Sequence, residues 1–190
     1  MKLIKFIPKE TKVIAFDLGG VLFKNDPEGI TYRSIAKQYK LNYEDVNKLL
    51  ARNYEIFHQG KISEKDFWAP LINKYHVSLE QCKKFYRSSV AINLPMFDFL
   101  KAVYKKYDCY TLNDEPREWM IYRVKKYHLK QYFKGFITSS FYGYTKPDKN
   151  LYKIFIRKVK VKPSEIFFIE DSKECILTAK KMGMRTFHYR

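Results

Sequence analysis

The sequence predicts an α/β fold in which a parallel β-sheet is interrupted after its first strand by a block of helices. Residues 13–16 form a continuous apolar run that leads into Asp17 and then into two glycines, as expected for a buried strand ending at a carboxylate and a turn. Apolar residues then recur at three- and four-residue spacing until about residue 90, which indicates helices. From about residue 93, short apolar runs alternate with helical patterns, which indicates βαβ units.

The helical block contains a series of predicted helices separated by turn signals. These helices span residues 30–39, 43–57, 64–75 and 79–90. Ser63, with Asp66 three residues later, forms an N-cap pattern before the third of them. A helical block inserted after one strand predicts a cap subdomain. We therefore expect residues 25–92 to form a helical cap, and residues 1–24 and 93–190 to form the α/β core.

The rest of the chain supplies further strands and the helices between them. The expected helices span residues 95–103, 118–127, 151–159 and 173–182, and the expected strands span residues 108–112, 136–138, 166–169 and 185–189. Gly183 follows the last helix, where a left-handed C-cap favours glycine. Strands that alternate with helices in this way form a parallel sheet with right-handed crossovers.

The charge of the chain is strongly basic. Its 190 residues include 37 Lys and Arg against 20 Asp and Glu, which gives a formal net charge of +17. The lysines are scattered along predicted helices, and no known nucleic-acid-binding motif accompanies them. We therefore interpret them as a solvated surface that attracts anions, and we expect no specific nucleic-acid partner.

Cysteine usage and hydropathy favour a cytoplasmic protein. Three widely spaced cysteines predict neither a zinc site nor a disulfide framework. Residues 1–9 lack an unbroken apolar core, so we expect no signal peptide. No apolar run approaches the ~20 residues of a membrane span, so we expect no membrane partner. The sequence carries no signal for an oligomeric state.

Short motifs occur in one order along nearly the whole chain. They are Phe-Asp-Leu-Gly-Gly-Val-Leu at 16–22, Tyr-Thr-Leu-Asn-Asp at 110–114, Lys-Pro-Asp at 146–148 and Ile-Phe-Phe-Ile-Glu-Asp-Ser at 166–172. Together they resemble the haloacid dehalogenase-like (HAD) hydrolases, most of which are Mg-dependent phosphatases. The resemblance implies a Rossmann-like sheet with strand order 5-4-1-2-3 and a helical cap that closes over the catalytic edge. Asp17 would then face Glu170 and Asp171 across a crevice.

Carboxylates gathered at one edge of a sheet repel each other unless a cation joins them, and oxygen ligands suit Mg²⁺. We expect Asp17 and Asp171 to bind the metal directly, and Glu170 to bind it as a second or water-mediated ligand. The resemblance adds the backbone carbonyl of Gly19. The alternative for Glu170 and Asp171 is an acidic pair that complements the dipole of the following helix.

The resemblance also implies roles in phosphoryl transfer. Asp17 would attack phosphorus to give an aspartyl-phosphate, and Lys146 would hold the phosphoryl oxygens as a fixed positive charge. In the second motif, Asn113 stands where the family usually has Ser or Thr, and its amide can donate a hydrogen bond to phosphate. Thr111 takes this place if the strand ends two residues earlier. The alternative for Asn113 is ordinary turn chemistry.

Gly19 is the main departure from the family pattern. Most family phosphatases have a second Asp there, which protonates the leaving alcohol and later deprotonates water. A subgroup that includes sugar-1-phosphate phosphatases has glycine instead, so glycine does not by itself imply inactivity. Glycine leaves open a slow enzyme, one that prefers easily departing alcohols, or one that takes its acid from elsewhere, with Asp26 and His58 as candidates.

The leading functional prediction is a Mg-dependent phosphatase that hydrolyses a small phosphate monoester, with sugar phosphates among the candidates. Halide displacement by the same aspartate needs no metal, and the pair Glu170 and Asp171 disfavours it. The alternative from another class is a catalytically weak or silent HAD-fold protein that binds a partner through its basic surface. Gly19 and the net charge favour that alternative, whereas Asp17, Lys146 and Asp171 oppose it.

Overall fold

A parallel β-sheet lies at the centre of the α/β part of the chain. The computed structural model describes residues 2–24 and 27–190. Within them, a five-stranded parallel sheet has the order β3-β2-β1-β4-β5. Its strands are β1 (Val13–Phe16), β2 (Asp108–Asn113), β3 (Gly135–Thr138), β4 (Ile166–Glu170) and β5 (Arg185–His188). This is the predicted order counted from the other edge, so the Rossmann-like fold prediction is confirmed.

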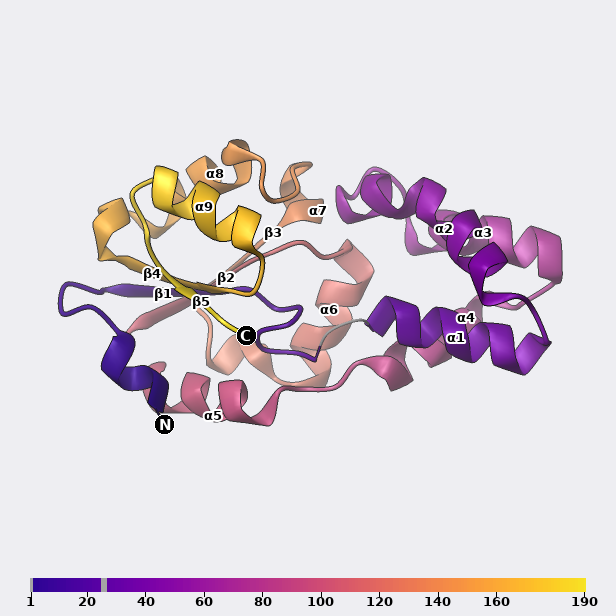
Figure 1. Cartoon of the computed structure of the whole chain (residues 1–190), viewed down its shortest axis with the longest axis horizontal. Coiled ribbons are helices and arrows are strands. Elements are labelled where there is room, and N and C mark those ends of the chain that lie inside the picture. The colour runs from indigo at the N-terminus through magenta and orange to yellow at the C-terminus, as the bar shows by residue number, and fades with distance from the viewer. Residues whose placement is uncertain (1, 25–26) are drawn as a thin grey trace.

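Strand β1 is central because it pairs with β2 on one side and β4 on the other, and helices bury both of its faces. Ile14 and Phe16 belong to one apolar cluster and Val13 and Ala15 to another, since successive side chains of a strand point to opposite faces. Helices α5 and α6 pack in the first cluster, while α8 and α9 cover the opposite face (Figure 1). A strand buried on both sides needs the unbroken apolar run from which β1 was predicted.

The helices agree with the prediction to within a few residues, and the short elements were not predicted. The α-helices are α1 (Pro27–Tyr39), α2 (Tyr43–His58), α3 (Glu64–Tyr75), α4 (Leu79–Ser89), α5 (Leu94–Val103), α6 (Arg117–Lys126), α7 (Ser139–Tyr142), α8 (Lys149–Val159) and α9 (Lys173–Lys181). The 3-10 helices are η1 (Lys2–Phe6), η2 (Leu129–Gln131) and η3 (Pro163–Glu165). Ser63 and Asp66 form the expected capping pair, and Gly183 has φ +83° after α9. No helix of the described chain is long and apolar enough to cross a membrane.

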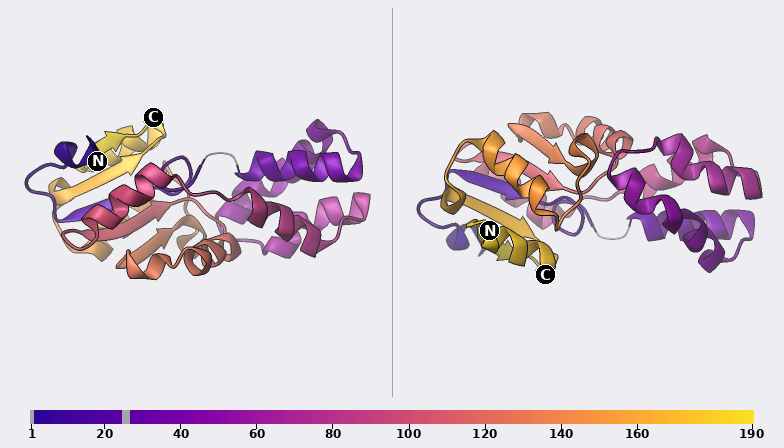
Figure 2. Two further views of the ribbon diagram at one scale, coloured as in Figure 1. Left: turned by 90° about the horizontal axis from the view of Figure 1, so that it is seen from below. Right: turned by 90° about the horizontal axis from the view of Figure 1, so that it is seen from above.

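Helices α1 to α4 form a lobe beside the sheet, as Figure 2 shows from two sides. The chain enters and leaves this lobe along neighbouring paths: the Lys24 N–H donates to the Ala91 carbonyl at 2.8 Å, and the Asn93 N–H donates to the Leu22 carbonyl at 2.9 Å. On this basis we propose residues 25–92 as the cap, and 1–24 with 93–190 as the core. The two residues at the proposed boundary, 25 and 26, lie outside the described part of the chain.

Hydrogen bonds join the cap to the core next to the carboxyl end of the sheet. Ser139 accepts from the Glu115 N–H at 3.0 Å and donates to the backbone carbonyl of His58, the last residue of α2, at 2.6 Å. The indole N–H of Trp119 on α6 donates to Glu64 on α3 at 2.9 Å. These bonds hold the end of α2 above the strand ends, so cap side chains take part in forming the cleft described next.

Candidate active site

Three acidic side chains meet where β1 and β4 end. In the register of the sheet, Phe16 is paired with Ile169, so Asp17 and Glu170 follow at neighbouring positions. Asp17, Glu170 and Asp171 place oxygen atoms within 4.8 Å of one another. Residues far apart in the sequence are thereby brought together, because parallel strands end at the same edge of a sheet.

Lys146 lies among these acids. Its Nζ is 2.8 Å from Asp17 Oδ1 and 2.5 Å from Glu170 Oε2, and only 4% of its side chain is exposed. The backbone N–H of Lys146 donates to both carboxylate oxygens of Asp114, each at 3.0 Å. Asp114 follows β2 directly, so it fastens the loop that carries Lys146 to the catalytic edge.

One lysine does not balance the negative charge gathered here. Burial raises the pKa of Asp17 well above its usual value, and this effect exceeds the lowering effect of Lys146. Burial also raises the pKa of Glu170, but Lys146, the backbone N–H of Ser172 and a side-chain hydrogen bond with Asp171 outweigh it and hold the pKa below its usual value. Burial lowers the pKa of Lys146, yet the carboxylates around it raise that pKa further, so Lys146 stays protonated. Asp17 therefore lacks a second positive charge.

The donor set fits a magnesium ion. Asp17, Glu170 and Asp171 offer carboxylate oxygens, the hard ligands that Mg²⁺ prefers. A divalent cation bound to them would favour the ionised form of Asp17, whose pKa burial otherwise raises. Gly19, the proposed carbonyl ligand, lines the cavities on both sides of Lys146.

The cleft has two adjoining parts that share Gly19, Asp114 and Lys146. The core part, of about 310 Å³, is lined by Asp17, Glu170 and other core residues. The cap-side part, of about 340 Å³, reaches the cap. Its further lining residues are Glu28, Tyr54, Glu55, His58, Glu115, Arg123 and Thr145. The acidic cluster thus opens toward the cap through the three residues that both parts share.

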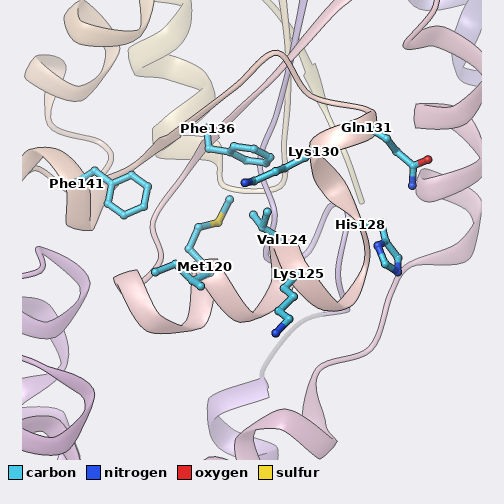
Figure 3. A pocket seen from close by; sticks show the side chains of 9 residues that line it. Met120, Val124, Lys125, His128, Lys130, Gln131, Phe136 and Phe141 are labelled. Atoms are coloured by element: carbon cyan, nitrogen blue, oxygen red, sulfur yellow. The ribbon is translucent and has the colours of Figure 1, made fainter.

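A larger cavity, of about 820 Å³, lies elsewhere, between α6, η2, β3 and α7. Figure 3 shows Met120, Val124 and Phe136 converging there, with Phe141 to one side. Its lining residues include no carboxylate. Size alone therefore does not make it the reactive site, and the acidic cleft is the better candidate.

The second motif is arranged differently from the other three. Asn113 is the last residue of β2, but its amide donates to Met120 Sδ at 3.9 Å and its carbonyl accepts from Thr138 at 3.1 Å. It is not among the residues lining either part of the cleft. The fallback, Thr111, is fully buried within the strand. Phosphate contact by Asn113 thus stays a prediction, while Asp114, to which the sequence analysis gave no role, lines both parts.

The structure describes one of the two alternative proton donors, His58, but not the other, Asp26. Asp26 lies outside the described residues. His58 lines the cap-side part of the cleft, and burial, with a further effect of Arg123, lowers its pKa from 6.5 to about 3. The imidazole is therefore neutral at neutral pH, which makes it a poor proton donor to a leaving alcohol.

The lowered pKa of His58 predicts acid-sensitive stability. Below pH 6.5 the unfolded chain binds a proton at this residue and the folded chain does not, so stability falls as the pH drops toward 3. His58→Phe removes this difference. We expect the unfolding free energy of the parent relative to the variant to fall by up to ~1.4 kcal/mol per pH unit between about pH 6 and 4. Urea denaturation at several pH values measures it, and parallel pH profiles would contradict the assignment.

Comparison with known proteins identifies the family. A family model described as haloacid dehalogenase-like hydrolase matches residues 14–189. The chain belongs to the haloacid dehalogenase-like hydrolases. The match covers all four motifs and the helical insert. The family membership predicted from those motifs is therefore confirmed.

Two curated relatives cover most of this HAD chain. D-ribitol-5-phosphate phosphatase of Bacteroides thetaiotaomicron is 26% identical over 190 residues, with 93% of this chain and 90% of that protein covered. Phosphorylated carbohydrates phosphatase of Thermotoga maritima is 23% identical over 184 residues, with 93% and 84% covered. A crystal structure of a HAD family enzyme from B. thetaiotaomicron, in complex with magnesium and inorganic phosphate, has a TM-score of 0.77 at 23% identity, with 94% and 93% covered. This likeness establishes a shared fold.

Proposed function

We propose that this HAD hydrolase is a Mg-dependent phosphatase that hydrolyses a small phosphate monoester through an aspartyl-phosphate on Asp17. The observation that carries the proposal is the meeting of Asp17, Glu170 and Asp171 at one sheet edge with Lys146 bound to Asp17 at 2.8 Å. The curated relatives act on sugar or carbohydrate phosphates by their names, which supports a phosphorylated polyol or sugar as the substrate class.

The proposed first step is attack by Asp17 on phosphorus. A bound Mg²⁺ supplies positive charge that reduces repulsion between the carboxylate and the phosphate. Lys146, whose ammonium contacts both Asp17 and Glu170, orients the nucleophile and offers a donor to the phosphoryl oxygens. Burial of these groups keeps water from screening their charges, which strengthens each interaction.

The proposed leaving step lacks the carboxylic acid that most family phosphatases have two residues after the nucleophile. At Gly19, no side chain exists to protonate the alcohol oxygen, and His58 is neutral. The alcohol would therefore depart without an acid at this position, and water would attack the aspartyl-phosphate without a carboxylate base there. The missing carboxyl group at position 19 also favours the second candidate function, a catalytically weak or silent HAD protein that binds a partner through its basic surface.

A hydrolysis screen separates these two functions. We expect the purified protein to hydrolyse p-nitrophenyl phosphate and a panel of sugar and polyol phosphates in the presence of Mg²⁺. Chelation of the metal should remove the activity, because Asp17 then stays short of positive charge. The control is Asp17→Asn at equal concentration. If the parent releases no more phosphate than this variant on any ester, the phosphatase proposal fails and the silent-protein alternative stands.

A further inference from the structure

Two side chains that line the cap-side part of the cleft each carry a buried polar atom without a hydrogen-bond partner in the described chain, and one of these atoms, His58 Nε2, lies 3.9 Å from Glu28 Oε1. Arg123 Nη1 and His58 Nε2 each lack a hydrogen-bond partner in the described part of the chain, and both side chains line this cavity. Arg123 is 1% exposed and His58 5%. A buried donor or acceptor left unpaired is energetically costly, so such atoms beside a cavity indicate a ligand that completes their hydrogen bonds.

Arg123 offers a donor in a fixed direction. Its Nε lies 3.0 Å from Glu115 Oε1, and its Nη2 donates to the Tyr86 hydroxyl at 2.9 Å. The guanidinium plane is held further by Phe23, whose ring centroid is 4.7 Å from Arg123 Cζ. Because the other nitrogens are engaged, Nη1 is left to donate to whatever enters the cavity.

His58 complements this donor with an acceptor. A hydrogen bond to the backbone of Asp114 raises the pKa of the ring, as a carbonyl acceptor does, although burial and Arg123 together lower it to about 3. This favours the neutral tautomer with the proton on Nδ1, which leaves a lone pair on Nε2. One hydroxyl group can accept from Arg123 and donate to His58, whereas an alkyl group can do neither.

The charges around the cavity disfavour an acidic ligand. Its carboxylates are those of Glu28, Glu55, Asp114 and Glu115. Its positive groups are already paired, Arg123 with Glu115 and Lys146 with Asp17. On a chain with net charge +17, this cavity is an acidic exception. A carboxylate or second phosphate entering it would meet like charge without a free cation.

We propose that the cap-side cavity is the alcohol subsite of the phosphatase, in which Arg123 and His58 bind a hydroxyl of the substrate and Glu28 and Glu55 exclude acidic alcohols. The substrate class is thus a hydroxylated, non-acidic phosphate monoester. This inference rests on the proposed phosphatase function. It adds the residues that select the alcohol and the exclusion of negatively charged alcohols.

A matched set of five-carbon esters tests the subsite. The probes are D-ribitol 5-phosphate, n-pentyl phosphate and 4-carboxybutyl phosphate, with p-nitrophenyl phosphate as a reference ester. In the parent we expect kcat/KM to fall at least about 10-fold from the ribitol ester to the pentyl ester, since the two buried atoms then stay unpaired, and to fall further for the carboxybutyl ester.

Two variants assign this selectivity to residues. His58→Phe keeps an aromatic ring against Tyr54, with which His58 stacks at 4.2 Å, but removes the acceptor. It should cut the preference for the ribitol over the pentyl ester, taken as the ratio of their kcat/KM values in the variant and in the parent, about 10-fold. Glu55→Gln should raise kcat/KM for the carboxybutyl ester, and Glu44→Gln, an exposed residue of the same helix outside the cavity, should not.

The outcomes distinguish a failure of the phosphatase function from a failure of the subsite alone. If the parent with Mg²⁺ hydrolyses none of the esters, not even p-nitrophenyl phosphate, the phosphatase function and the subsite fall together. If it is hydrolysed but the parent treats the three five-carbon esters alike, or Glu55→Gln and Glu44→Gln behave alike, the subsite alone is refuted. A purely structural role for His58 would lower turnover of every ester equally. Should His58→Phe not fold, the Glu55 and Glu44 comparison still decides.

Discussion

Asp17→Asn should lower kcat by at least about 10⁴-fold, because the proposed mechanism passes through a bond between this carboxylate and phosphorus. An amide keeps the shape of the side chain and a hydrogen-bond acceptor for Lys146, which now lies 2.8 Å from Asp17 Oδ1. It is not a nucleophile of useful strength. Steady-state phosphate release with saturating Mg²⁺ and p-nitrophenyl phosphate measures the loss.

The same variant should be no less stable than the parent. Burial raises the pKa of Asp17 well above its usual value, so ionised Asp17 costs folding free energy at neutral pH, and a neutral amide removes that cost. Lys146 keeps its contact with Glu170. Thermal unfolding without metal therefore provides the control. Inactivity with a clearly lower Tm would point to damage to the fold, and activity within tenfold of the parent would refute Asp17 as the nucleophile.

Gly19→Asp should lower the ratio of kcat/KM for aryl phosphates to kcat/KM for alkyl phosphates by about 10²-fold or more. This lies within the ~10²–10⁴-fold range of general acid–base catalysis. The parent should strongly favour p-nitrophenyl phosphate, whose alcohol leaves with little protonation, over a primary alkyl phosphate. The backbone accepts the change: a Cβ at Gly19 meets no heavy atom within 4 Å, and Gly19 is not among the glycines with positive φ. The ratio of kcat/KM for the two esters is the measurement.

Gly19→Asn is the matched control, because it has nearly the same size and no acid. It should leave the aryl-to-alkyl ratio close to that of the parent. A different result would be informative in a definite way: if the parent hydrolyses alkyl phosphates as readily as aryl ones and Gly19→Asp is no better, another residue supplies the proton. Equal effects of Asp and Asn would show that bulk, and not proton transfer, causes the change.

Most of the fold was predictable because it depends on local patterns. A strand buried on both faces must be apolar throughout, so unbroken apolar runs predicted β1 and β4. Helical periodicity predicted the helices of the proposed cap. The order of the strands came from the family resemblance. Asp17 and Glu170 meet because their strands are neighbours in that order, and the sheet order that brings them together is confirmed.

The end of β2 shows the limit of such patterns. Successive residues of a strand point to opposite faces, so a shift of one residue decides which side chain enters a cleft. Asn113 is still part of β2, and its amide bonds to Met120 and Thr138, whereas Asp114 holds the backbone of Lys146. The turn signal at these positions gave no indication of that choice.

The sequence suggested His58 as a candidate proton donor, but its proximity to Arg123 could not be predicted, for a different reason. Arg123 lies on α6 of the core and His58 at the end of α2, and no spacing rule connects them. They share a cavity because Ser139 and Trp119 hold the cap against the core through tertiary hydrogen bonds. The acidic lining of the cleft is likewise hidden in a composition dominated by lysine.

The most direct test of the account is to trap the covalent intermediate. The protein is mixed with p-nitrophenyl phosphate and Mg²⁺, quenched in acid at times shorter than one turnover, and digested for mass spectrometry. Because no carboxylate stands at position 19 to activate water, the intermediate should accumulate. We predict one added phosphoryl group on the peptide that contains Asp17, absent from Asp17→Asn. Steady hydrolysis with no phosphorylated peptide at any quench time, or with the phosphoryl group on another residue, would contradict the account.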